Sequence, residues 1–192
     1  MQSKVFSNWL FKVVVILGLF GLLQIITQNR PTQPMRVVLP TVQTSSSSPV
    51  RLIIPRIGVD STVESVGFTT DGSMEAPKGP TTTAWFNRGP IPGEVGSAVI
   101  DGHFGWKDGV SAVFDKLSEL KSGDKVYVED ASGTRTTFVV RIVRVYEENA
   151  DASKVFISND GHAHLNLITC GGVWDKGSKD YSTRTVVFTD AM

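Results

Sequence analysis

Residues 124–147, "DKVYVEDASGTRTTFVVRIVRVYE", show the clearest strand signal in the chain. Asp124–Asp130 alternates polar and apolar residues with period two, which is typical of a strand with one buried face. The residues "ASGT" that follow are turn formers, and the alternation resumes over Thr136–Glu147. Two alternating runs separated by a short glycine-containing turn predict an antiparallel β-hairpin.

Shorter apolar runs on both sides of this hairpin predict further strands. "RLIIPRIGV", residues 51–59, contains a proline, and because proline cannot donate to a strand ladder we expect an edge strand there. The other runs are Ser97–His103, His164–Cys170 and Arg184–Asp190. Several short strands with turn-rich connections indicate a mainly β domain, either an antiparallel or mixed barrel or a sandwich.

One short helix is expected among these strands. Over Ala112–Leu120 the apolar residues Val113, Leu117 and Leu120 recur at the spacing of one helical face. The predicted fold is therefore mainly β with short helices.

The first 26 residues differ sharply from the rest. Residues 9–26 are almost entirely apolar, and a helix needs about 20 such residues to cross a bilayer core. A cleaved signal peptide is the alternative, but the residues after Ile26 lack the small-x-small pattern of a cleavage site. We therefore predict a tail and transmembrane anchor over residues 1–26, and Lys4 and Lys12 favour a cytoplasmic N-terminus.

Residues 27–50 are rich in Pro, Thr and Gln and include four consecutive serines. Such a segment buries too little apolar surface to fold alone, so it predicts a flexible linker. The folded domain is then expected over residues 51–192, outside the cell and attached to the cell membrane by a single span.

Composition excludes several classes of function. The 192-residue chain contains nineteen basic and nineteen acidic side chains, and this balance argues against a nucleic-acid partner. A single cysteine, Cys170, excludes both an internal disulfide framework and a cysteine-rich zinc site. The one thiol therefore has no cysteine to pair with inside the molecule.

Cys170 lies at a position that favours chemistry. It closes the apolar run of residues 164–170 and is followed by "GGVWDKG", and loops of this kind often contain functional residues. A thiol reacts as the thiolate and needs a base or a cation nearby. His103, at the end of another predicted strand, can supply the base if the two strands are neighbours.

Arg184 is the third candidate. The predicted loop of residues 171–183 most simply joins two antiparallel strands, so Cys170 at the end of one strand lies near Arg184 at the start of the other. A guanidinium there can lower the pKa of the thiol and bind a developing oxyanion.

Together these segments resemble the sortase family, the cysteine transpeptidases of Gram-positive-type cell surfaces. The resemblance depends on "VIDGH" ending at His103, "NLITCGG" around Cys170 and "STRTVVF" around Arg184, and it extends over about residues 51–190. "IPRIGVDSTVESVGFTTDGSMEAPKGP" and "SAVFDKLSELKSGDKVYVE" are most similar to class F or class E sortases.

This resemblance implies a closed eight-stranded β-barrel and a two-step acyl transfer. Cys170 would attack the Thr–Gly bond of an LPxTG-like sorting signal at the C-terminus of a surface protein. His103 would act as acid and base, and Arg184, helped by Thr169, would bind the substrate and the oxyanion. The acceptor would be an amine of a peptidoglycan precursor or of a pilin, and the chemistry requires no metal or organic cofactor.

Two more residues are expected to contribute to the substrate site. Trp174 follows Cys170 closely enough to form one wall of it. Asp101 lies two residues before His103, and on a strand the two would face the same side. We expect the Asp101 carboxylate to favour the protonated form of His103.

The remaining motifs favour structural interpretations. His162 and His164 form a His-x-His pair that could bind a metal with Asp101, but no fixed spacing supports such a site, and solvated side chains are favoured. Trp85 and Trp106 fall in predicted loops, where capping the barrel core is the default role.

Two rival functions remain open from the sequence. A cysteine peptidase with water as the acceptor shares every residue of the acylation step. A membrane-tethered β-domain that binds surface peptides without catalysis is the second, and it predicts that Cys170 resists alkylation.

Overall fold

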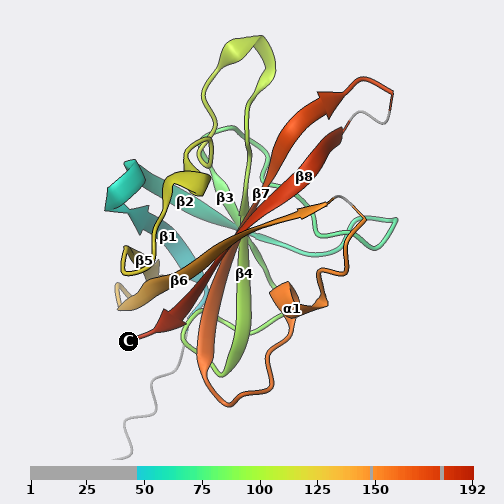
Figure 1. The fold of residues 1–192 in the computed structure, drawn as a ribbon. Helices are drawn as coiled ribbons and strands as arrows, with labels where there is room; N and C mark the ends of the chain where they lie inside the picture. The colour runs from blue at the N-terminus through green and yellow to red at the C-terminus, as the bar shows by residue number, and fades with distance from the viewer. Residues whose placement is uncertain (1–46, 148, 178–179) are drawn as a thin grey trace, which may run out of the picture. The chain divides into compact units, whose positions relative to one another are not determined.

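Eight strands close into a barrel in the computed structural model of the chain, which describes residues 47–147, 149–177 and 180–192 (Figure 1). The order around the barrel is β1-β2-β3-β4-β7-β8-β6-β5. The strands are β1 Pro49–Ile54, β2 Val59–Val66, β3 Thr83–Phe86, β4 Gly96–Gly102, β5 Lys125–Asp130, β6 Arg135–Glu147, β7 Ala163–Asp175 and β8 Asp180–Ala191. The predicted mainly β, closed eight-stranded fold is confirmed.

The helices of the described residues are short. They are the 3-10 turns η1 Pro55–Ile57, η2 Lys107–Gly109 and η3 Leu117–Glu119, and the single α-helical turn α1 Ser153–Phe156. The helix predicted over Ala112–Leu120 is wrong in type, because turns and η3 replace it. Val113 and Phe114 instead donate their N–H groups to the carbonyls of Pro80 and His103, at 2.7 and 3.0 Å, which ties the segment to neighbouring loops.

The prediction of an edge strand around Pro55 is also wrong. β1 pairs with β2 on one side and with β5 on the other, so barrel closure leaves it no free edge. Pro55 begins η1 after the strand has ended, and its missing N–H therefore removes no ladder hydrogen bond. β1 begins at Pro49, so the last two residues of the predicted linker belong to the barrel.

One predicted loop is in fact a buried strand. Trp85 and Phe86 lie in β3 and are only 5% and 7% exposed. β3 pairs in parallel with β2 and antiparallel with β4, and all four of its residues are buried. A strand buried on both faces shows no alternation, so periodicity alone could not distinguish it from an apolar loop.

The strands pack apolar residues on both faces of the barrel wall. The interior is filled by side chains from all parts of the barrel, including Leu52, Ile100, Phe114, Phe138, Leu165 and Leu167. A second, smaller cluster lies on the outer face beside α1 and consists of Phe86, Val99, Val155, Val186 and Phe188. Alternation along β7 therefore directs Leu165 and Leu167 inward, and His164, Asn166, Ile168 and Cys170 to the outer face.

The predicted anchor and almost all of the predicted linker lie outside the described residues. Within the part of the chain that the structure describes, no helix is both long and apolar enough to cross a membrane.

Candidate active site

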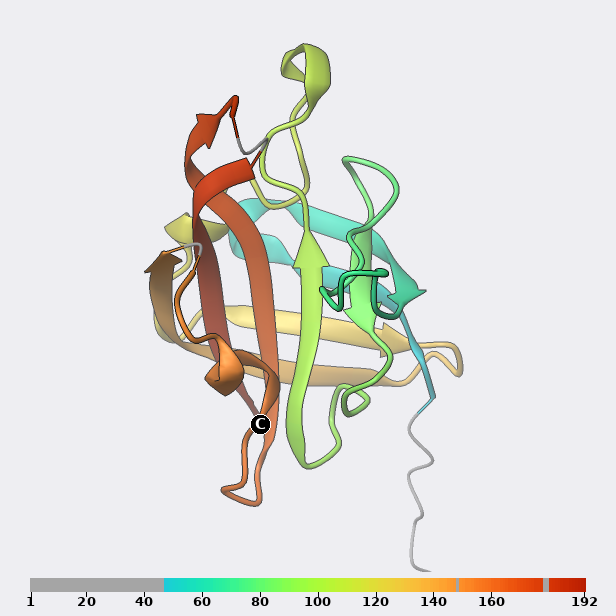
Figure 2. The same cartoon turned by 90° about the vertical axis from the view of Figure 1, so that its right-hand side faces the viewer.

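The strand that leads into His103 and the strand that contains Cys170 are neighbours. β4 pairs with β7 in parallel, with Asp101 opposite Ile168, so both strands run toward the same end of the barrel. The loop after β4, which contains η2, and the β7–β8 hairpin project from this end, as both ribbon views show (Figure 2). This pairing brings His103 and Cys170 to one rim.

A cleft of about 510 Å³ lies at this rim, and both His103 and Cys170 line it. Most of its remaining wall is aromatic. The full lining is His103, Phe104, Gly105, Trp106, Lys107, Cys170, Trp174, Asp180 and Tyr181. The expected convergence of thiol and imidazole on one cavity is therefore found.

Cys170 is a partly buried free thiol on the outer face of β7. Burial raises its pKa above the usual value, because a thiolate is poorly stabilised away from water. The charge of Arg184 opposes this shift, and those of Asp101 and Asp180 add to it. The raised pKa favours the neutral thiol, which must lose its proton before it can attack.

Arg184 lies directly opposite Cys170 in the β7–β8 ladder, as expected. The two strands do not end there, however. β7 continues past Cys170 to Asp175, and β8 already begins at Asp180, before Arg184. Their pairing is irregular between Gly171 and Trp174. Cys170 and Arg184 thus lie within a long twisted hairpin and not at the mouth of a loop.

The glycines after Cys170 permit this close pairing. Gly172 has φ +78°, and a Cβ there would lie 2.4 Å from Ser182 Oγ and 2.9 Å from Thr183 Oγ1. A larger residue there would require the side chains of Ser182 and Thr183 to move, and the positive φ favours glycine in any case. The second glycine of the "GG" motif is therefore favoured by both the backbone conformation and the packing of the hairpin beside the thiol.

The guanidinium of Arg184 is held by its own strand. Nη2 donates to Asp180 Oδ2 at 2.5 Å, and Nη1 donates to the carbonyls of Tyr181 and Thr183 at 2.9 and 3.0 Å. The carboxylate of Asp180 therefore competes with any oxyanion for the same fork of donors.

The His103 ring is anchored at one nitrogen. Its Nε2 lies 2.7 Å from the carbonyl oxygen of Pro77. Because a carbonyl only accepts, Nε2 carries a proton, and Nδ1 is the nitrogen free to exchange one. The ring also packs against Trp106, with 4.7 Å between ring centroids.

The carboxyl group of Asp101 interacts electrostatically with the Cys170 thiol and with Arg184. Burial raises its pKa to about 7, against a hydrogen bond from the Gly102 backbone and the attraction of Arg184, which both lower it. No hydrogen bond or ion pair joins Asp101 to His103 among the described residues. β4 ends at Gly102, so His103 has left the strand and the alternation that placed the two on one face no longer applies.

Thr169 faces away from the cleft. Its buried hydroxyl donates to the Gly102 carbonyl at 2.6 Å, which joins the end of β4 to β7 next to His103 and Cys170. Trp174 does line the cleft, and its ring meets the edge of Tyr181 at a centroid distance of 5.1 Å. The two residues therefore have different roles: Thr169 holds two strands together within the barrel, and Trp174 forms part of the cleft surface.

The His-x-His pair does not form a metal site with Asp101. His164 lies at the opposite end of β7, where its ring bonds Asp160 and Asp190. Among residues 47–147, 149–177 and 180–192, no group of three or more His, Cys, Asp or Glu side chains could hold a metal ion.

Sequence reasoning missed Asp180, Tyr181 and the role of Trp106. Asp180 and Tyr181 fall inside the segment predicted as a loop, and in a loop the sequence does not indicate in which direction a side chain points. The available signal was the spacing of Asp180 and Arg184, four residues apart with opposite charge.

The fold is a closed eight-stranded barrel with a thiol, an imidazole and a guanidinium at one rim. This combination indicates the class of β-barrel enzymes that use a cysteine nucleophile. A family model described as a sortase domain matches residues 52–192. The match covers most of the chain, so the chain belongs to the sortase family. Membership supports the cysteine transpeptidase activity that the sequence resemblance implies. No curated protein sequence gives a match.

Solved structures have the same fold. Sortase C-1 from Actinomyces oris is 23% identical, with a TM-score of 0.57 over 74% of this chain and 72% of that one. A lid mutant of sortase A from Corynebacterium diphtheriae is 20% identical, with a TM-score of 0.57 over 78% of this chain and 74% of that one. A sortase D5 transpeptidase from Clostridium perfringens is 19% identical, with a TM-score of 0.55 over 74% of this chain and 77% of that one. These structures are named for classes C, A and D, so the class F or class E assignment stays a prediction.

Proposed function

We propose that the chain cleaves an LPxTG-like sorting signal between Thr and Gly and transfers the acyl part to an amine at the cell surface. The observation that supports this most strongly is the shared cleft of His103 and Cys170, with Arg184 directly opposite Cys170 in the sheet. Surface proteins with a C-terminal sorting signal are the proposed substrates.

Acylation begins with transfer of the Cys170 proton to Nδ1 of His103. The thiolate then attacks the carbonyl carbon of Thr, and the C=O electron pair moves onto oxygen to give a tetrahedral oxyanion. Collapse of this intermediate breaks the C–N bond, and His103 gives its proton to the leaving glycine amine. The product is a thioester on Cys170.

Deacylation reverses the roles. The incoming amine attacks the thioester carbonyl, His103 Nδ1 takes the proton from the attacking nitrogen, and the C–S bond breaks. His103 then returns this proton to the departing thiolate. We propose that the amine belongs to a peptidoglycan precursor or a pilin.

Arg184 is the proposed oxyanion and substrate donor. Its guanidinium contacts Asp180 at rest, so binding the oxyanion requires the fork to exchange this carboxylate for the substrate. Thr169 is assigned a positioning role, because its hydrogen bond to Gly102 joins the end of β4, next to His103, to the part of β7 that presents Cys170. Trp174 and Asp101 complete the proposed site, the former as a wall and the latter through its charge.

The proposed location is the cell membrane, with one span, a cytoplasmic N-terminus and the barrel outside. This follows from the apolar residues 9–26 and the linker after them. The same arrangement would keep the barrel close to other membrane-attached molecules.

Incubating the full chain with an LPxTG-type peptide, with and without an added glycine-based amine, tests this proposal by product mass. The expected result is cleavage after Thr and a product carrying the amine. Hydrolysis products alone, even at high amine concentration, would identify a peptidase. An unchanged peptide together with an alkylation-resistant Cys170 would favour the non-enzymatic β-domain.

A further inference from the structure

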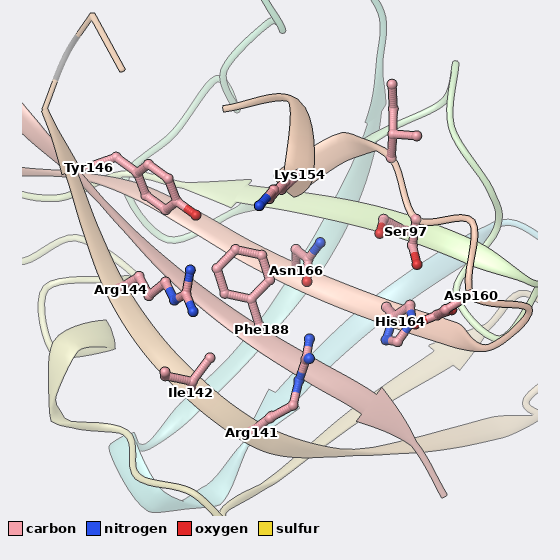
Figure 3. A pocket seen from close by; sticks show the side chains of 12 residues that line it. Ser97, Arg141, Ile142, Arg144, Tyr146, Lys154, Asp160, His164, Asn166 and Phe188 are labelled. Carbon is pink, nitrogen blue, oxygen red and sulfur yellow. The ribbon is translucent and has the colours of Figure 1, made fainter. Parts of the chain in front are cut away.

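A second pocket lies on the outer face of the barrel wall, away from the thiol cleft. Its volume is about 300 Å³, and it lies over β6, β8 and β7 beside α1 (Figure 3). It shares no lining residue with the cleft that contains Cys170. The pocket therefore needs an explanation independent of the proposed acyl transfer.

An irregularity in β6 places basic residues in the wall of the pocket. The β6–β8 register shifts between Val140 and Ile142, so Arg141 is the extra residue of a β-bulge. Both Arg141 and Ile142 consequently line the pocket, and alternation adds Arg144 two residues later. The bulge thus brings two guanidinium groups to one side of the sheet.

Three cations surround the pocket, and its lining includes a single carboxylate, Asp160. The charged ends of Arg141, Arg144 and Lys154 are arranged around the ring of Phe188 (Figure 3). Arg141 is 3.4 Å from Asp190, but among the described residues neither Arg144 nor Lys154 has an ion-pair partner. The lining is therefore electropositive and suits an anionic ligand.

Asn166 provides a second, independent indication of a ligand. It is 1% exposed, and its Nδ2 donates to the Val155 carbonyl at 2.6 Å. Its Oδ1 is buried and has no hydrogen-bond partner among the described residues. A buried acceptor without a donor is unfavourable, so a bound N–H or O–H group would be stabilising there.

We propose that this pocket binds a short acidic peptide segment of another protein. Arg144 and Lys154 would bind its carboxylates, its backbone N–H would donate to Asn166 Oδ1, and an apolar side chain would rest on Phe188. A peptide supplies all three groups within two or three residues, whereas a simple phosphate supplies only the oxyanion. Residues 1–50 of this chain contain no Asp or Glu, so the chain's own N-terminal segment is not the ligand.

Calorimetric titration of the full chain tests the proposal without depending on catalysis. The probe is an N-acetylated peptide amide of sequence phenylalanine-glutamate-glutamate, and its matched control replaces both glutamates with glutamine. Inorganic phosphate is titrated separately. The variants are Arg144→Gln and Lys154→Gln, with the exposed Arg56→Gln outside the pocket as the control.

The glutamate peptide is expected to bind at least about tenfold more tightly than the glutamine peptide. Arg144→Gln and Lys154→Gln should each weaken it by about tenfold, and Arg56→Gln should leave it unchanged. Equal binding of the two peptides, or wild-type affinity in both pocket variants, would overturn the proposal. Phosphate that binds as tightly as the peptide and shows the same losses would overturn the peptide assignment.

Discussion

The two ends of the β7 segment His164–Cys170 present the same face of one sheet, yet their polar groups are in opposite states. At one end, both ring nitrogens of His164 bond carboxylates, Nδ1 to Asp190 at 2.8 Å and Nε2 to Asp160 at 2.9 Å. At the other end, Cys170 has a raised pKa and lies opposite an arginine whose contacts are within its own strand. The first end is satisfied by the protein itself, and the second has groups that a substrate can engage.

This difference teaches that a histidine beside two acids need not be catalytic. His164 has more acidic partners than His103, but those partners hold it in place. Among the described residues, His103 has a hydrogen bond at Nε2 and packs against Trp106, so its second nitrogen can exchange a proton while the ring remains oriented. The end that we propose as the active site is the one where His103 and Cys170 are positioned but keep groups available to a substrate.

Replacing the thiol should give the largest effect. Cys170→Ala removes the proposed nucleophile and should lower transfer activity on the order of 10⁴-fold or more. The free energy of unfolding should change by less than about 1 kcal/mol, because the side chain is small and only partly buried. Peptide-transfer assays and urea unfolding measure the two quantities. Activity retained by a folded Cys170→Ala chain would end the assignment of this rim as the reactive one.

Arg184→Gln should have the next largest effect. Loss of an oxyanion donor typically lowers the rate by roughly 10²–10³-fold. The pKa of Cys170 should also rise, since the charge of Arg184 lowers it in the native protein. The rate of iodoacetamide alkylation as a function of pH reports this shift.

Arg51→Gln is the matched control for this change, because Arg51 forms its ion pairs with Asp60 and Glu129 on another part of the surface. It should leave both the transfer rate and the alkylation profile unaltered. If Arg184→Gln behaved in the same way, the guanidinium would have no part in the reaction.

At the other end, His164→Gln should affect stability and not the thiol. Burial lowers the pKa of His164, but its hydrogen bonds to Asp160 and Asp190 outweigh this and raise it above 6.5. The stabilisation from the charged form is therefore complete below the pKa of the unfolded chain and is lost as the pH rises through the folded pKa. We expect a loss of about 1–2 kcal/mol at pH 6 and a smaller loss at pH 9.

His162→Gln is the control for that measurement, since His162 is exposed and two residues away. Urea unfolding at the two pH values should show little change for it. A loss for His164→Gln that is equal at both pH values would mean that ionisation of this histidine does not contribute.

The smallest expected effect belongs to Asp101→Asn. The charge of Asp101 raises the pKa of Cys170, so its removal should lower that pKa and speed alkylation at pH 8 by less than about tenfold. Because the pKa of Asp101 is raised from 3.8 to about 7, the native protein is favoured by protonation, and its stability should fall as the pH rises from about 4 to 7. Asp101→Asn should abolish that part of the slope, which unfolding measured across this range would detect.

Local pattern and spacing predicted part of this picture. The hairpin of residues 124–147 and the facing of Cys170 and Arg184 followed from alternation and chain connectivity, and the eight-stranded closure from the family resemblance. The pairing of β4 with β7 joins segments far apart in the sequence. Local spacing could not predict it, so from the sequence it could only be assumed.

The missed features share a physical cause. β3 is buried on both faces and has no period to detect, and the long β7–β8 hairpin passes through glycines that usually indicate a loop. The contact of Asp180 with Arg184 and the basic pocket on the outer face depend on a twisted hairpin and a β-bulge, which local sequence patterns do not specify.

Intact-protein mass spectrometry of the full chain with an LPxTG-type peptide, quenched with acid before turnover is complete, tests the central claim most directly. The account predicts an added mass equal to the peptide acyl fragment ending at Thr, located on Cys170, absent from Cys170→Ala and present in His164→Gln. An adduct that persists in Cys170→Ala, or none in a folded wild-type chain that consumes the peptide, would contradict it.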